Sequence, residues 1–172
     1  GHGALIQNLN SLEGDCVFIQ NIDNIPNENS QAKARQKRQV MGGVLFNIVN
    51  ERNRLFQTIQ DSNDPETLNE ARSFLTTWFQ YQEIRNDRSS ILQALNKPIR
   101  ICGMVKNTGE PGGGPFWVTA DGFTSKQIIE SAQVNKNEIE QKYIFEQATH
   151  FNPVDLVCHF KDPHGIKYNL DN

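Results

Sequence analysis

The sequence predicts an α/β protein, a single domain over residues 1–172 with one mixed sheet and a block of helices. A continuous apolar run at residues 16–19 is typical of a buried strand, and apolar residues recur at helical spacing within residues 31–96. After Pro98 the pattern changes to a period of two, which favours strands. We therefore expect strands near residues 15–20, 98–105, 115–119 and 126–133.

The first 25 residues predict a glycine turn, a short helix and a strand. The helix ends at Gly14, and one of its faces is apolar because these residues fall at helical spacing: Ala4, Leu5, Leu9 and Leu12. The apolar run at residues 16–19 suits a strand that is covered on both faces. Asp23 follows this strand, and open α/β sheets bind ligands at the carboxyl ends of their strands.

Asp23 is therefore a candidate ligand of Mg²⁺. This ion takes one or two protein carboxylates and fills its other positions with water and substrate phosphates, so a single aspartate at the end of a strand can complete the protein's share of the site. The alternative is an Asx-turn, in which the side chain of Asp23 or Asn24 bonds its own backbone.

Residues 31–96 predict a helical insertion beside the sheet. Its first helix, near residues 31–60, is interrupted by Gly42-Gly43, which marks close packing or a bend. Asp64-Pro65 has the pattern of a helix start, and a third helix follows near residues 89–96, capped by Ser89 or Ser90. A basic cluster in the first helix either faces an anionic ligand or forms a solvated face: Lys33, Arg35, Lys37 and Arg38.

A glycine-rich segment follows the strand predicted after Pro98. The backbone of Gly112, Gly113 and Gly114 can approach a phosphate or a sugar closely, but it can equally form a mobile loop. No Lys-Ser/Thr pair follows these glycines, so the segment is not a P-loop. Two strands joined by a turn at Asp121-Gly122 then form a hairpin.

The opening GHGAL and the later NIDN, with a helix and a strand between them, resemble the GHG…N-x-DN pattern of the nucleotide-sugar pyrophosphorylases, which join UTP to a sugar 1-phosphate. The resemblance implies a glycosyltransferase-A-like sheet. It also implies that Asp23 binds Mg²⁺ and that four residues bind the nucleotide: Gly1, His2, Gly3 and Asn21. The chain resembles still more closely an uncharacterised bacterial family of the Bacteroidetes type, whose members have a longer chain before GHGAL.

The hairpin resembles the sugar-binding segment of uridylyltransferases that act on N-acetylhexosamine phosphates. Glu130 matches the acid that grips sugar hydroxyls, although Ser131 stands where that family has an aromatic residue. Residues 148–151 resemble a second segment near the sugar, which implies that His150 and the loop at residues 112–114 also bind it. The alternatives are an exposed glutamate on an edge strand and a structural histidine.

The resemblance implies transfer of a nucleotidyl group, a uridylyl group from UTP, to a sugar 1-phosphate with release of pyrophosphate. The phosphate of that sugar is mostly dianionic at neutral pH, with a second pKa of about 6, so it is already a nucleophile. Positioning and electrostatics then supply the catalysis. Because the triphosphate-binding loop of that family has no match here, we expect part of a longer enzyme that is inactive alone.

The composition limits which other classes of protein the chain can belong to. A net charge of −3 gives no reason to expect nucleic acid, and no apolar run is long enough to cross a bilayer. Three widely spaced cysteines predict buried free thiols in a reducing compartment, which favours the cytoplasm: Cys16, Cys102 and Cys158. Two other functions stay open, a glycosyltransferase of the same fold and a non-catalytic binding or regulatory module.

Overall fold

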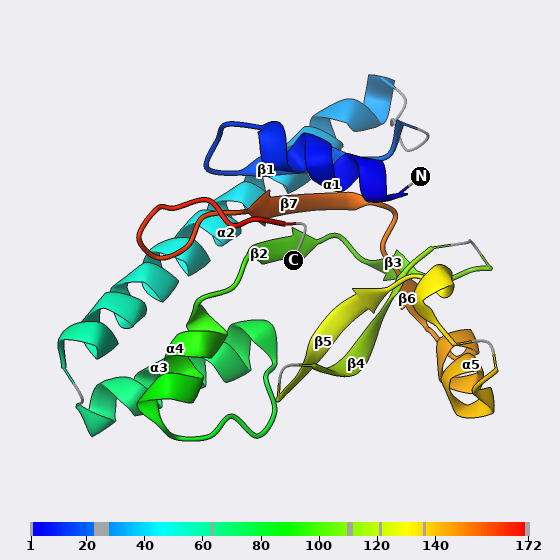
Figure 1. Cartoon of the computed structure of the whole chain (residues 1–172). Helices are drawn as coiled ribbons and strands as arrows, with labels where there is room; N and C mark the ends of the chain where they lie inside the picture. Colours follow the sequence, from blue (N-terminus) through cyan, green and yellow to red (C-terminus); the bar gives the residue numbers. More distant parts are fainter. Residues whose placement is uncertain are drawn as a thin grey trace.

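The structure is a computed structural model that describes residues 2–22, 28–62, 64–109, 112–120, 122–135 and 137–170. It is a mixed α/β protein in which the described strands form small antiparallel sheets (Figure 1). One sheet has three strands in the order β1-β7-β2, and two more sheets pair β3 with β6 and β4 with β5. The single mixed sheet that the sequence predicted is therefore wrong for the described residues.

The three-stranded sheet consists of β1 (Val17–Gln20), β2 (Ile99–Cys102) and β7 (Asp155–His159). β7 lies in the middle and is antiparallel to both neighbours, so Val17 and Arg100 both lie opposite Cys158. Strand β7 was not predicted from the sequence. It runs antiparallel to both β1 and β2, so the whole three-stranded sheet is antiparallel.

The strand predicted at 98–105 is divided in two. β2 ends at Cys102, and β3 (Val105–Lys106) pairs with β6 (His150–Phe151) in another sheet. Gly103 is held at the break, because its amide donates to the carbonyl oxygen of Asp155 at 2.8 Å and its carbonyl oxygen accepts from the side chain of Asn152 at 2.6 Å. These two bonds turn the chain from one sheet to the other.

Helices occupy most of residues 31–96, as the sequence predicted: α2 (Glu28–Asp61), α3 (Pro65–Phe79) and α4 (Arg88–Leu95). The side chain of Asp64 accepts from the amide of Thr67 at 2.9 Å, which is the predicted N-cap. The cap of α4 is Asp87, whose carboxylate accepts from the amide of Ser90, so the prediction of a serine cap is wrong.

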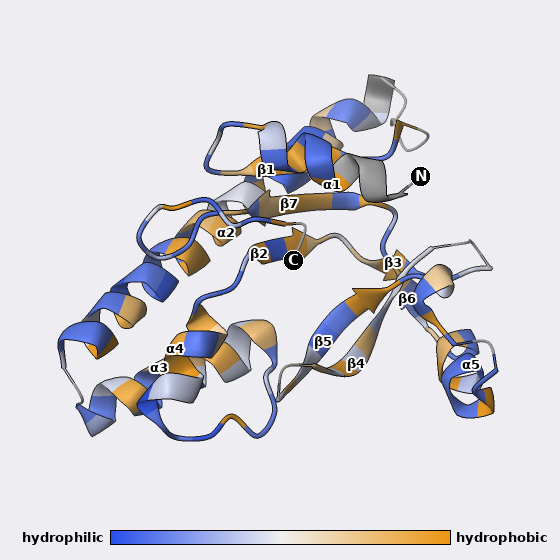
Figure 2. Cartoon of the chain, viewed as in Figure 1, coloured by the Kyte–Doolittle hydropathy of each residue, from blue (hydrophilic) through white to orange (hydrophobic). Residues whose placement is uncertain are grey.

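The hydrophobic core lies between these helices and one face of the three-stranded sheet. Alternate strand residues point to opposite faces, so Ile99 and Val157 are buried in the core, whereas Arg100 and Cys158 point to the other side. Figure 2 shows β7 as hydrophobic along most of its length. The fully buried apolar members of the core come from four elements: Leu55, Ile59, Ala71, Leu75, Ile91, Leu95 and Val157.

Strand β1 is an edge strand, and the prediction that it is covered on both faces is wrong. The side chain of Phe18 is 48% exposed, and Cys16 is exposed as well. The ring of Phe18 lies 3.0 Å from the position that a β-carbon on Gly42 would take, so Gly42 marks close packing of α2 on β1. The prediction of buried thiols holds for Cys158, whose pKa burial raises to about 12, and fails for Cys16.

The second half of the chain forms a hairpin of β4 (Gly114–Ala120) and β5 (Phe123–Ile129), then a 3₁₀ turn, η2 (Ser131–Gln133), and α5 (Ile139–Glu146). The strand predicted at 126–133 therefore ends early, and α5 was not predicted. The ring of Phe145 on α5 stacks on Phe116 of β4, with 5.4 Å between the centroids.

Helix α1 (His2–Ser11) lies beside β1 and β7 (Figure 1). The ammonium group of Lys167 donates to the carbonyl oxygens of Leu9, Asn10 and Leu12, which ties the carboxyl end of α1 to the last part of the chain. None of the helices among the described residues is both long and apolar enough to cross a membrane.

Candidate functional site

The residues predicted to bind the nucleotide and the metal are placed only in part. Gly1 and Asp23 lie outside the described residues. The backbone of His2 and Gly3 belongs to the first turn of α1, so these two residues do not form the predicted glycine turn. Asn21 follows β1 directly, and its amide donates to the carbonyl oxygen of Val154 at 3.0 Å. The nucleotide and Mg²⁺ assignments stay predictions.

A groove beside the end of β1 is lined by part of the basic cluster. Arg35 and Arg38 line it together with Phe18 and Gln20, and its volume is about 390 Å³. Arg38 also pairs with Asp155 at 3.2 Å, which ties α2 to β7. The basic cluster thus has two parts. Arg35 and Arg38 line the groove, whereas Lys33 and Lys37 do not line it and are exposed, as expected of a solvated face.

The predicted sugar-binding segments, which are residues 112–114, Glu130 and residues 148–151, meet at one place. We call this place, together with Asn152, the glycine corner. The amide of Asn152 donates to the carbonyl oxygen of Gly113 at 2.8 Å. A β-carbon on Gly113 would lie 2.6 Å from a carboxylate oxygen of Glu130, and one on Gly114 would lie 3.3 Å from the β-carbon of Ala148. Three segments that are distant in the sequence therefore touch.

His150 is not shown to join the other side chains of the corner. Phe151 points to the corner, because a β-carbon on Gly112 would lie 2.7 Å from its ring. Consecutive residues of a strand point to opposite faces, which directs the His150 imidazole away from Gly112. His150 is exposed, and its Nδ1 lies 3.0 Å from the hydroxyl of Thr149.

Asn152 is a residue of the corner that the sequence analysis missed. It is 4% exposed, its side-chain amide donates to Gly103, and its side-chain oxygen accepts from the amide of Val154 at 3.0 Å. The bond to Gly103 holds this segment against the end of β2, and the bond from the Asn152 amide to Gly113 holds it against the glycine segment. The Asn-Pro dipeptide at 152–153, a turn signal, was the indication in the sequence.

Glu130 lies between the end of β5 and the start of η2, so it is not on a strand as predicted. Its amide donates to the side-chain oxygen of Gln133, and its carbonyl oxygen accepts from the amide of Gln133, both at 2.9 Å. The backbone is thus fixed while the side chain remains exposed. An ionised carboxylate accepts several hydrogen bonds, so the exposed carboxylate of Glu130 suits a ligand rich in hydroxyl groups.

The Gly113→Ala variant is expected to lose about 1–3 kcal/mol of stability, because the added methyl group overlaps Glu130 and lies 2.7 Å from the side chain of Ile128. Gly43→Ala is the matched control. Nothing lies within 4 Å of its added β-carbon, and alanine in a helix stabilises by up to about 1 kcal/mol relative to glycine. Urea denaturation followed by circular dichroism measures both. Equal midpoints for the two variants would contradict the close contact at the corner.

The comparisons with known proteins identify a family. A search of curated proteins and a search of solved structures each found no match. One family model, described as "Domain of unknown function (DUF4301)", matches residues 1–172. Because this match spans all of the sequence, the chain belongs to the DUF4301 family.

Proposed function

We propose that the chain is part of a nucleotidyltransferase that transfers a nucleotidyl group, uridylyl from UTP, to a sugar 1-phosphate in the presence of Mg²⁺. One observation carries the proposal. The glycine segment, Glu130 and residues 148–151, which the resemblance assigns to sugar binding, lie together at the glycine corner, although the His150 side chain points away from Gly112. Contact between segments so far apart is expected if they share a ligand.

In the proposed reaction, a phosphate oxygen of the sugar 1-phosphate attacks the α-phosphorus of UTP, and the bond to the β-phosphate breaks to release pyrophosphate. Glu130 accepts hydrogen bonds from sugar hydroxyls, and the sugar approaches along the exposed backbone of Gly112. The groove lined by Arg35 and Arg38 adds positive potential beside the strand that precedes Asp23.

A single carboxylate, that of Asp23, suits Mg²⁺ as the proposed metal. Among the described residues, no three or more His, Cys, Asp or Glu side chains gather into a metal-binding group. Zinc sites usually need such a group, whereas Mg²⁺ that bridges phosphates needs only one or two carboxylates. Asp23 would hold the ion, which supplies charge neutralisation on the phosphates when bound.

The test is pyrophosphate release from UTP and N-acetylglucosamine 1-phosphate with Mg²⁺, using the longest natural protein that contains this chain. Glu130→Gln is expected to raise KM for the sugar 1-phosphate by about tenfold or more, because hydrogen bonds to a charged group are lost. KM for UTP is expected to stay unchanged. Glu140→Gln, on the exposed first turn of α5, is the control.

An unchanged KM for the sugar 1-phosphate in Glu130→Gln would overturn the assignment of the corner. The same assay separates the two alternatives. Release of UDP from a UDP-sugar, without pyrophosphate release from UTP, would indicate a glycosyltransferase. Binding of a UDP-sugar without turnover would indicate a non-catalytic module.

A further inference from the structure

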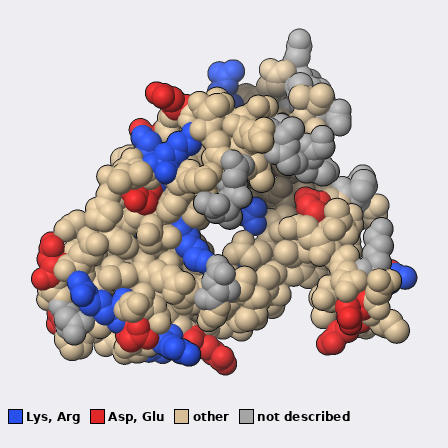
Figure 3. Space-filling view, viewed as in Figure 1, with Lys and Arg blue, Asp and Glu red and all other residues tan. Residues whose placement is uncertain are grey.

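Two strand edges border a hollow of about 790 Å³ in the middle of the molecule. β2 is an edge strand of the three-stranded sheet, and β5 has only β4 as a strand neighbour among the described residues. Residues of both strands line the hollow, among them Arg100 on β2 and Ile128 on β5. Figure 3 shows an opening at this place, with basic side chains at its edge. We call this space the strand gap.

The free backbone groups of β2 point toward the strand gap. Hydrogen-bonded and non-bonded positions alternate along an antiparallel ladder. The amide of Gly103 donates to the carbonyl oxygen of Asp155, so Ile101, two residues earlier, is also bonded to β7. The backbone groups of Arg100 and Cys102 therefore point away from β7, and both residues line the strand gap. This edge of β2 offers donors and acceptors that a further strand can bond.

β5 presents a second edge to the same space. The carbonyl oxygen of Thr124 accepts from the amide of Gln82 at 2.8 Å, so the backbone groups of Thr124 point away from β4. Those of Lys126 and Ile128 point the same way, because the direction repeats every two residues, and both residues line the strand gap. Gln82 covers only the first part of this edge, which leaves the remainder open to a further strand.

The two edges do not pair with each other. The guanidinium of Arg100 donates to the side-chain oxygen of Gln127 at 3.1 Å, so two long side chains together bridge the space between the strands. Neighbouring strands of a sheet lie only about 4.8 Å apart. A strand placed in the strand gap would bond both edges and join the three-stranded sheet to the β4–β5 hairpin.

The wall of the strand gap is apolar on both faces of the sheet. Leu156 and Ile101 point to opposite faces of the sheet, and both line the strand gap. Side chains of the helices join them, such as Ile6 on α1 and Leu95 on α4. A strand that is covered on both faces is nearly continuously apolar. The wall therefore suits a mostly apolar segment.

The strand gap also carries positive charge that no acid balances. Arg100 contacts the neutral side chain of Gln127, and no Asp or Glu lies among the described residues of the wall. A hydrogen bond between two ionised groups is stronger than one to a neutral oxygen. One acidic residue in an inserted strand would therefore replace Gln127 as the partner of Arg100.

We propose that an extended, mostly apolar segment with one acidic residue fills the strand gap as a β-strand between β2 and β5. The segment belongs to the longer polypeptide that contains this chain, a choice that rests on the proposed function, in which the chain is part of a longer enzyme. Two open backbone edges favour a peptide over a small molecule, because an extended peptide repeats donors and acceptors along its length.

Amide hydrogen exchange at single residues tests the proposal in the longest natural protein that contains this chain. The amides of Arg100, Lys126 and Ile128 are expected to exchange about as slowly as that of Ile101, which is bonded within the sheet. Trp117 is the reference for an open edge, because it lies opposite Lys126 and its amide points away from β5. We expect its amide to exchange at least about tenfold faster.

Exchange at Lys126 and Ile128 as fast as at Trp117 would overturn the proposal. This result is expected if a small apolar molecule fills the strand gap, since such a molecule bonds no amide, or if the strand comes from a separate protein that the sample lacks.

The variant Arg100→Gln tests the acidic partner. We expect exchange of the Lys126 amide to become about tenfold faster, because a bond between charged groups is lost. Arg72→Gln, which removes an exposed charge of α3, is the control and is expected to leave this exchange unchanged. Exchange in Arg100→Gln at the wild-type rate would contradict the role of Arg100. The proposed function fails or holds separately, because its readout is KM for the sugar 1-phosphate in Glu130→Gln.

Discussion

Replacement of Arg52 by Met is expected to lower the free energy of unfolding by about 3 kcal/mol, because one buried and two partly buried carbonyl oxygens lose their donor. Arg52 lies on α2 and is 0% exposed. Its guanidinium donates to the carbonyl oxygens of Leu95 and Lys97 at 3.3 and 3.4 Å and to that of Lys161 at 2.9 Å. A single side chain thus joins α2 to the chain before β2 and to the chain after β7.

The loss is smaller than a count of bonds would suggest. Burial lowers the pKa of Arg52, which shows that the charged form carries a desolvation cost, and Met removes that cost. The positive charge of Arg52 also acts on His159: burial lowers the pKa of His159, and the charge of Arg52 lowers it further. The lost bonds still outweigh the relief, because the carbonyl oxygens that lose this donor are at least partly shielded from water.

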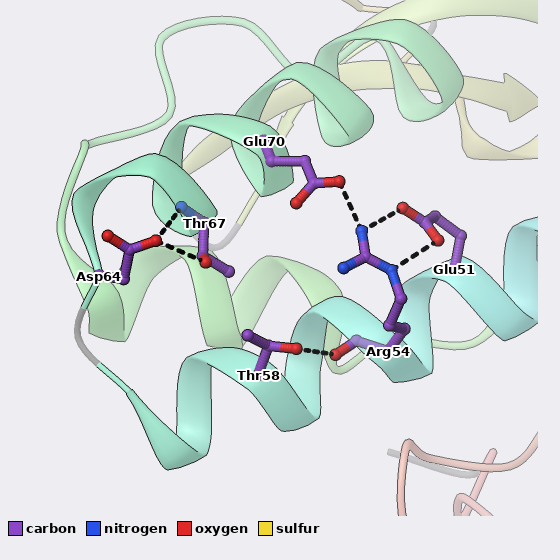
Figure 4. A network of polar contacts seen from close by, with 6 residues as sticks. All are labelled: Glu51, Arg54, Thr58, Asp64, Thr67 and Glu70. Atoms are coloured by element: carbon purple, nitrogen blue, oxygen red, sulfur yellow. Dashed lines mark hydrogen bonds and ion pairs between the residues drawn. The ribbon is translucent and has the colours of Figure 1, made fainter.

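Arg54→Met is the matched control, two residues further along α2. Arg54 pairs with Glu51 and Glu70 in an exposed network (Figure 4), where ion pairs contribute less than about 1 kcal/mol. Urea denaturation of both variants and the wild type gives the two changes in stability. Equal losses for the two variants would show that Arg52 does not hold the buried segments together.

Replacement of Asp23 by Asn, in the longest natural protein that contains this chain, is expected to reduce nucleotidyl transfer by orders of magnitude and to leave the melting temperature unchanged. Asn has the same shape and can still form a turn through its side-chain oxygen. It lacks the negative charge that Mg²⁺ selects. The two interpretations of Asp23 therefore predict different activities for the same stability.

Pyrophosphate release over a range of Mg²⁺ concentrations measures the effect. Asp61→Asn, at the exposed end of α2, controls for a change of charge elsewhere and is expected to turn over like the wild type. Turnover of Asp23→Asn at the wild-type rate with saturating Mg²⁺ would indicate that Asp23 is a turn residue. It would also remove the main reason to expect nucleotidyl transfer.

The elements that depend on neighbouring residues could be predicted from the sequence. The Asp64-Pro65 start of α3 was predicted because an N-cap is a local hydrogen bond between residues three apart. The β4–β5 hairpin was predicted because a turn signal separates two apolar runs, and Gly122 indeed has a positive φ of 79°. Helices in residues 31–96 followed from apolar periodicity alone.

Long-range pairing could be decided only by the tertiary structure. An apolar run shows that a strand is partly buried but does not identify its partner, so the place of β7 between β1 and β2 was not predictable. The burial of Arg52 was not predictable either. An arginine on a helix is expected to be solvated, and only the tertiary structure brings the segments around residues 95 and 161 against it. The glycine corner is a product of this closure, because its side chains come from segments that only the completed fold brings together.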